Sequence, residues 1–145
     1  MGAQKYGPRV ALVKNFAESK ATWAVDMITS FERLIKRSSP NSSIEVFNAV
    51  LNDELPDPAS FDIIILTGGT YNLAQEKIEA WVSREAEWVR QMAKNAPDTR
   101  LIGVCWGHQL IAYALGGSIE HVPNKHVVSF KSLGIWKPQL CNRGG

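Results

Sequence analysis

The 145-residue sequence is poor in cysteine and has no long apolar run. Its two cysteines, Cys105 and Cys141, are too few for a disulfide framework and form no C-x-x-C or Cys/His ligand pattern. No apolar run reaches membrane-spanning length, and the amino-terminal MGAQKYGPR has no apolar signal core. We therefore expect a cytoplasmic protein in a reducing compartment, with no membrane segment, no metal site and no cofactor.

The sequence also has little net charge. The net charge is only +2, and acidic and basic residues are interspersed, so no basic stripe indicates a nucleic-acid partner. What the sequence does have is apolar residues: they make up 45% of it and include five Trp and five Phe. A chain of this length and composition can bury a core and predicts one domain.

Apolar runs and amphipathic stretches alternate along the first 117 residues. Short apolar runs predict strands at 9–13, 44–50, 61–67 and 101–104. Apolar spacing predicts helices at 20–37 and 75–94, and an apolar helix that follows the turn at Cys105 and includes 110–115. In the first helix the predicted apolar face comprises Trp23, Met27, Ile28, Phe31, Leu34 and Ile35. The run FDIIILT at 61–67 is typical of a central parallel strand covered on both faces. This order of elements predicts an α/β fold with a parallel sheet.

The pattern weakens after Gly117. Short strands are expected at 118–122 and 127–130, and 131–145 shows no clear period. We place the domain at 9–130 and treat 131–145 as an irregular tail.

Cys105 lies in a turn between a predicted strand and a predicted helix. Gly103 and Gly107 flank it at two residues on each side, which makes a G-x-C-x-G arrangement like the G-x-S-x-G nucleophile elbow. Such a turn is strained and closely packed, so it needs small residues. A thiol at a helix N-terminus is favoured as the thiolate. The pattern thus predicts a reactive cysteine; the alternative is a small buried cysteine at a strand end.

A glycine pair, Gly68 and Gly69, follows the central predicted strand. In open α/β sheets the functional crevice lies outside the carboxyl ends of the strands, so this pair and Cys105 should meet there. The N–H groups of Gly69 and Trp106 are then the natural donors to an oxyanion. The expected chemistry is acyl transfer through a thioester.

The sequence Gly-Val-Cys-Trp-Gly-His-Gln, followed by Ala-Leu-Gly-Gly, closely resembles the nucleophile motif of class I glutamine amidotransferases. The upstream Thr-Gly-Gly resembles their oxyanion loop, and the resemblance covers 9–122. It implies a flavodoxin-like three-layer sandwich with a mostly parallel sheet. It also implies hydrolysis of glutamine or of a γ-glutamyl amide, with Cys105 as nucleophile and Gln109 helping to hold the substrate.

The sequence departs from the family after the cysteine. Family members take their base from a His followed closely by a Glu, and no His-x-Glu pair follows Cys105. His121 and His126 fall where the family has the strands just past the elbow helix, and His108 is interpreted as structural. We therefore predict little glutaminase activity from these residues alone.

Two explanations for this departure stay open: a truncated domain, or a domain completed by a protein partner or self-association. Either leaves part of the elbow helix and one sheet edge less covered, as an exposed apolar patch. Two other functional classes also remain: a non-catalytic relative that binds a ligand or partner, and a DJ-1/PfpI-type cysteine protein. The Trp-Gly-His-Gln sequence favours the amidotransferase class over the DJ-1/PfpI type.

Overall fold

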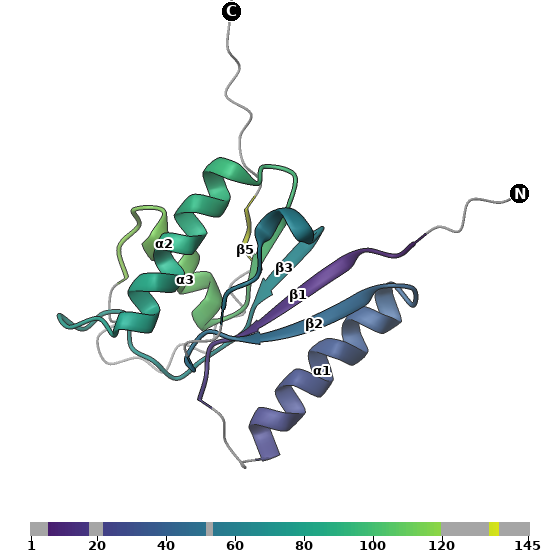
Figure 1. Cartoon of the computed structure of the whole chain (residues 1–145). Coiled ribbons are helices and arrows are strands. Elements are labelled where there is room, and N and C mark those ends of the chain that lie inside the picture. Colours follow the sequence, from purple (N-terminus) through teal and green to yellow (C-terminus); the bar gives the residue numbers. More distant parts are fainter. Residues whose placement is uncertain (1–5, 18–21, 52–53, 120–133, 137–145) are drawn as a thin grey trace, which may run out of the picture.

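The computed structural model describes residues 6–17, 22–51, 54–119 and 134–136 (Figure 1). Within them one sheet has the strand order β2-β1-β3-β4-β5. The strands are β1 (Arg9–Lys14), β2 (Ser43–Asn48), β3 (Ile63–Leu66), β4 (Arg100–Gly103) and β5 (Gly134–Trp136). The helices are α1 (Thr22–Ser38), α2 (Ala80–Asn95) and α3 (Trp106–Ala114), with a 3-10 turn η1 (Pro58–Ser60). The first four strands are parallel, whereas β5 runs antiparallel to β4.

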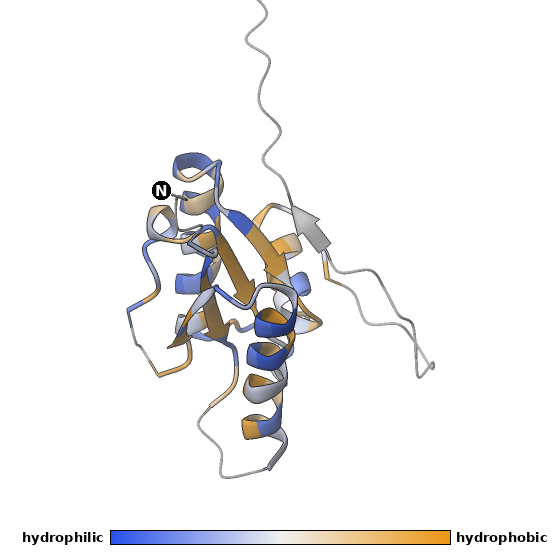
Figure 2. Ribbon diagram, turned by 90° about the vertical axis from the view of Figure 1, so that its right-hand side faces the viewer, coloured by the Kyte–Doolittle hydropathy of each residue, from blue (hydrophilic) through white to orange (hydrophobic). Residues whose placement is uncertain are grey.

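The central strands are the most apolar part of the chain. Val10 to Val13 of β1 and Ile64 to Leu66 of β3 are all buried, because helices cover both faces of the sheet there. Figure 2 shows these strands as the continuous apolar centre of the molecule.

Helices cover the two faces of the sheet unequally. On one face α1 packs Ile28, Phe31 and Ile35 against a cluster that includes Leu12 and Ile65. On the other, α2 and α3 share a larger cluster with the strands, and α1 lies on the opposite side from them (Figure 1). The layers and the strand order confirm the predicted α/β, flavodoxin-like sandwich.

The predicted order of strands and helices is confirmed, but two details of the helices were wrong. Helix α2 begins at Ala80 rather than at residue 75. The Tyr71 hydroxyl donates to the Lys77 carbonyl (3.2 Å) and accepts from the Glu79 N–H (2.8 Å), and so holds the preceding segment as turns. In α1, Trp23 and Leu34 are 44% and 62% exposed, because only a narrow apolar stripe of the helix packs against the sheet.

The chain after α3 also differs from the prediction. Ser118 and Ile119 are not in a strand, and the rest of the two strands expected at 118–122 and 127–130 lies outside the described residues. Strand β5 lies inside 131–145, where the sequence indicates no regular element. It pairs Ile135 with Ile102, so backbone pairing rather than a sequence pattern defines it, and this outer edge of β4 is not bare.

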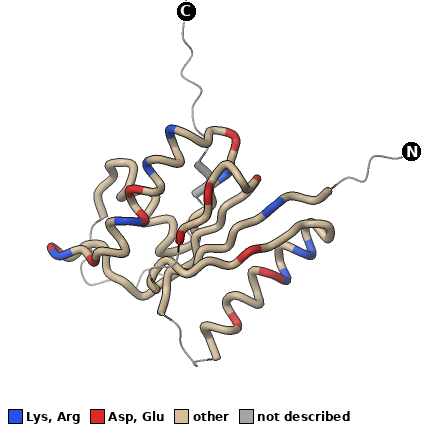
Figure 3. Tube along the Cα trace, in the orientation of Figure 1, with Lys and Arg blue, Asp and Glu red and all other residues tan. Residues whose placement is uncertain are grey.

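Basic and acidic residues are interspersed over the described elements (Figure 3). In the part of the chain that the structure describes, no helix combines the length and the apolar character needed to cross a membrane.

Candidate functional site

Cys105 and the glycine pair lie side by side at the carboxyl edge of the sheet. Strand β3 leads into Gly68 and β4 leads toward Cys105, and the two strands are paired neighbours with Leu66 opposite Gly103. A methyl group built on Gly68 would lie 3.6 Å from the Cβ of Cys105. The structure thus brings together two features that are separated by more than 30 residues in the sequence.

Cys105 has an unusual backbone conformation. Its φ is 53° and its ψ is −110°, and it is the single non-glycine residue with positive φ among the described residues. It immediately precedes α3, and its side chain is exposed. Such a conformation costs about 1–3 kcal/mol and persists only where the surroundings impose it.

The surroundings of this turn are closely packed backbone. The Val104 N–H donates to the Leu66 carbonyl and the Gly107 N–H donates to the Val104 carbonyl, both at 3.0 Å. A Cβ at Gly103 would lie 2.6 Å from the Gly107 backbone, and one at Gly107 would lie 2.5 Å from the Leu66 oxygen. Both positions therefore exclude any side chain, which explains the glycines on either side of Cys105.

The backbone N–H groups of Gly69 and Trp106 are the predicted oxyanion donors. Outside the helices and strands, no backbone hydrogen bond between described residues uses the N–H of Gly69 or of Trp106 as its donor. The Trp106 side chain turns into the core, where it is 2% exposed and its ring centroid lies 5.3 Å from that of Trp81. The Trp106 indole thus anchors the start of α3 against Trp81 of α2.

Gln109 and His108 are exposed residues on the first turn of α3. The Gln109 N–H donates to the Cys105 carbonyl at 3.2 Å, so Gln109 lies one helical turn beyond Cys105. His121 and His126 lie outside the described residues.

Two polar residues lie beside the glycine pair: Asn15, which the sequence analysis missed, and Thr67, which it named only as part of Thr-Gly-Gly. Both are buried, and the Asn15 N–H donates to the Thr67 hydroxyl at 3.1 Å. Each directly follows an apolar strand, and a polar residue in that position of an α/β sheet is the signal that could have found them.

Helix α2 contains a buried carboxyl group. Glu85 of α2 is 0% exposed, and neither carboxyl oxygen has a hydrogen-bond partner among the described residues. Burial raises the pKa of Glu85 to about 8, and the positive charge of Arg84 opposes this rise in part. The side chain is therefore mostly protonated at neutral pH.

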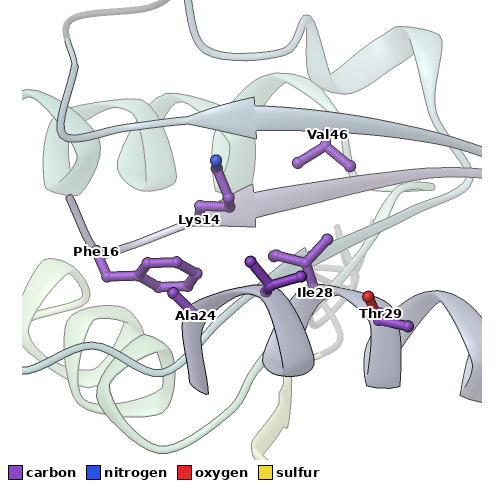
Figure 4. A pocket seen from close by; sticks show the side chains of 7 residues that line it. Lys14, Phe16, Ala24, Ile28, Thr29 and Val46 are labelled. Carbon is purple, nitrogen blue, oxygen red and sulfur yellow. The ribbon is translucent and has the colours of Figure 1, made fainter. Parts of the chain in front are cut away.

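Three cavities have linings that do not include Cys105. One of about 220 Å³ opens between α1 and the ends of β1 and β2 (Figure 4). Its lining residues are Lys14, Phe16, Ala24, Val25, Ile28, Thr29 and Val46. Larger grooves of about 610 and 430 Å³ also involve none of the predicted site residues. Cys105 is exposed, and over the described residues no group of three or more His, Cys, Asp or Glu side chains is placed to hold a metal ion.

Comparison with known proteins finds glutamine amidotransferases and amidotransferase-like proteins. The family model for "Glutamine amidotransferase class-I" matches residues 23–134. Over 127 residues the chain is 39% identical to the glutamine amidotransferase-like protein chry6 of Gibberella zeae and 24% identical to the glutamine amidotransferase-like protein chyE of Penicillium rubens. Each alignment covers 88% of this chain and 52% of the relative, so the chain spans about half the length of these curated relatives.

A solved structure supports the same fold. The crystal structure of a glutamine amidotransferase from Thermotoga maritima matches with a TM-score of 0.55 and 19% identity, over 74% of this chain and 43% of that chain. The family match covers most of the chain, and the similarity to chry6 extends over nearly all of it. The chain therefore belongs to the class I glutamine amidotransferase family.

Proposed function

We propose that Cys105 is the nucleophile of a site that cleaves the side-chain amide of glutamine or of a γ-glutamyl compound. The observation that carries the proposal is the conformation of Cys105: an exposed thiol at positive φ, at the start of α3 and beside Gly68. Strain of this kind is maintained at a turn that must present a side chain to a reacting group. The family assignment supports the choice of an amide as substrate.

In the proposed reaction, the Cys105 thiolate adds to the amide carbonyl carbon. The N–H groups of Gly69 and Trp106 donate to the oxyanion that forms. The C–N bond then breaks, ammonia leaves after gaining a proton, and the γ-glutamyl group remains on Cys105 as a thioester. Water hydrolyses the thioester and releases glutamate. Gln109 holds the substrate beside the thiol.

Turnover needs a proton donor for the leaving ammonia, and the 145 residues have no His-x-Glu pair after Cys105. Because this proton is needed when the C–N bond breaks, we expect slow acylation of Cys105 by glutamine and little release of glutamate. Loss of the base alone removes most of the rate in such catalytic units, even when the nucleophile is in place. A protein partner, or a second copy of the chain, that supplies this base would restore turnover.

The test is labelling with the glutamine analogue 6-diazo-5-oxo-norleucine, followed by peptide mass spectrometry. We expect one adduct, on Cys105, that excess glutamine prevents and that Cys105→Ser abolishes. Cys105→Ser should leave the circular dichroism spectrum unchanged. No adduct, together with ready oxidation of Cys105 by peroxide, would instead support a DJ-1/PfpI-like cysteine or a non-catalytic relative. Steady glutamate release by the purified chain, lost in Cys105→Ser, would refute the expected lack of turnover.

A further inference from the structure

We propose that Asn15 is a positioning residue that holds the Gly68–Gly69 segment against the start of α3, and so sets where the Gly69 N–H points. Its catalytic consequence depends on the proposed function, whereas its effect on the segment does not. Asn15 directly follows β1, and β1 is the neighbour of β3, which leads into the segment. Asn15 therefore lies where the end of β1 meets the loop that follows β3.

Two hydrogen bonds connect Asn15 to the residue before the glycines. The Asn15 N–H donates to the Thr67 hydroxyl at 3.1 Å, and the Asn15 Nδ2 donates to the Thr67 carbonyl at 3.2 Å. The Thr67 hydroxyl in turn donates to the Gly68 carbonyl at 3.0 Å. The chain of bonds therefore runs from Asn15 through Thr67 to the first glycine of the pair.

Burial gives these bonds their importance. Asn15 is 1% exposed and Thr67 is 0% exposed, so water cannot replace a bond that is lost. The Asn15 Oδ1 is buried without a hydrogen-bond partner among the described residues. The amide is thus held by its Nδ2 alone, and that bond determines its orientation.

Direct contact adds to the hydrogen bonds. A Cβ built on Gly69 would lie 2.3 Å from the Asn15 carbonyl oxygen, so the backbones of the two residues touch. Gly69 has no room to move toward β1, while the bonds through Thr67 keep the segment from moving away. Together they fix the distance between the Gly69 N–H and Cys105.

Asn48 provides a matched control for the test. It is also a buried asparagine, 3% exposed, at the end of β2, and it lies opposite Lys14 in the register of the sheet. Its Oδ1 accepts from the N–H groups of Val50 and Leu51 (3.1 and 3.3 Å). Asn48→Ala therefore removes buried hydrogen bonds of a turn that follows a neighbouring strand.

The first measurement follows the segment itself by ¹⁵N NMR. In Asn15→Ala the amide resonances of Gly68 and Gly69 should shift, and hydrogen exchange of the Thr67 N–H, which donates to the Val13 carbonyl at 3.0 Å, should quicken roughly tenfold. Asn48→Ala should leave these signals in place. Unchanged signals in Asn15→Ala, or equal changes in both variants, would overturn the proposal.

The second measurement compares two reactions of Cys105. Acylation by L-γ-glutamyl-p-nitroanilide forms an oxyanion: the thiolate adds to the carbonyl, the C–N bond breaks, and p-nitroaniline leaves with a proton from water. Alkylation by iodoacetamide forms no such oxyanion. Asn15→Ala should lower the acylation rate roughly 10- to 100-fold and leave alkylation within about twofold, because a small misplacement of a donor has effects of this size. Asn48→Ala should change neither the acylation rate nor the ratio of acylation to alkylation by more than about twofold.

The outcomes separate the two proposals. If the wild-type protein releases no p-nitroaniline and forms no adduct with the diazo compound, the proposed function fails, and the NMR result alone decides the role of Asn15. If acylation occurs but its ratio to alkylation is the same in Asn15→Ala, the positioning role fails while the nucleophile stands. If Asn15→Ala does not fold, two variants of Thr67 replace it in the test. Thr67→Val removes the linking hydroxyl and should lower the ratio of the acylation rate to the alkylation rate, whereas Thr67→Ser retains the hydroxyl and should keep most of that ratio. Equal ratios in Thr67→Val and Thr67→Ser would also overturn the proposal.

Discussion

Replacing Glu85 by glutamine should stabilise the protein increasingly as the pH rises. Glu85 is fully buried on α2, and neither carboxyl oxygen has a hydrogen-bond partner among the described residues. Burial raises its pKa from the ordinary 4.5 to about 8, with the charge of Arg84 acting in the opposite direction. The folded protein therefore keeps a proton on Glu85 that the unfolded chain releases at a lower pH.

The sign and the size of the effect follow from proton linkage. Below pH 4.5 both states hold the proton and Glu85 contributes no penalty. Between pH 4.5 and about 8 the unfolded state binds fewer protons, so the free energy of unfolding falls as the pH rises, by up to about 1.4 kcal/mol per pH unit. At pH 7 the accumulated penalty is on the order of 3 kcal/mol, which glutamine avoids because it does not ionise.

Urea denaturation followed by tryptophan fluorescence, at several pH values from 5 to 8, measures this difference. We expect wild type and Glu85→Gln to have similar free energies of unfolding near pH 5 and to diverge by a few kcal/mol at pH 8. Glu87→Gln, on the exposed side of the same helix, is the control. Hydrogen bonds from Gln91 and Arg90 lower the pKa of Glu87, so the stability that it contributes is lost only as the pH falls toward acid values. Wild type and Glu87→Gln should therefore differ by a constant amount from pH 5 to 8. A constant difference between wild type and Glu85→Gln from pH 5 to 8 would refute the reasoning.

Two further predictions concern the turn around Cys105. Gly107→Ala should lower the free energy of unfolding by about 2 kcal/mol, because its Cβ would lie 2.5 Å from the Leu66 oxygen, whereas Gly68→Ala, with its nearest contact at 3.6 Å, should cost less than about 1 kcal/mol. Equal losses in urea denaturation would contradict the close packing of this turn. Cys105→Gly should be more stable than Cys105→Ala by about 1 kcal/mol, because glycine adopts the observed φ of 53° without strain; thermal melts that place alanine above glycine would mean that the turn relaxes.

Much of the fold could be predicted from local patterns. A strand that is buried on both faces must be apolar throughout, so the apolar runs in the sequence predict β1 and β3. Glu85 lies on the inner face of α2, where Val82 and Val89 flank it at helical intervals. What spacing could not reveal is that this face leaves the carboxyl without a partner.

The candidate site was predictable to a similar degree. The glycines on either side of Cys105 are a local requirement of one turn, and the glycine pair ends a central strand; both are properties of short segments. Trp23 and Leu34 illustrate the opposite case. Their helical spacing matches a buried stripe, yet they are exposed, because the width of the stripe that the sheet covers depends on the packed partner.

The sequence by itself determined the alternation of strands and helices, the position of Cys105 in a tight turn, and the family to which that turn belongs. Only the tertiary structure decided that Asn15 meets Thr67, 52 residues away, that β5 pairs with β4, and that Glu85 is protonated at neutral pH. The physical reason is range: propensity, capping and turn chemistry act within a few residues, whereas these three depend on which distant groups the folded chain brings into contact and closes off from water.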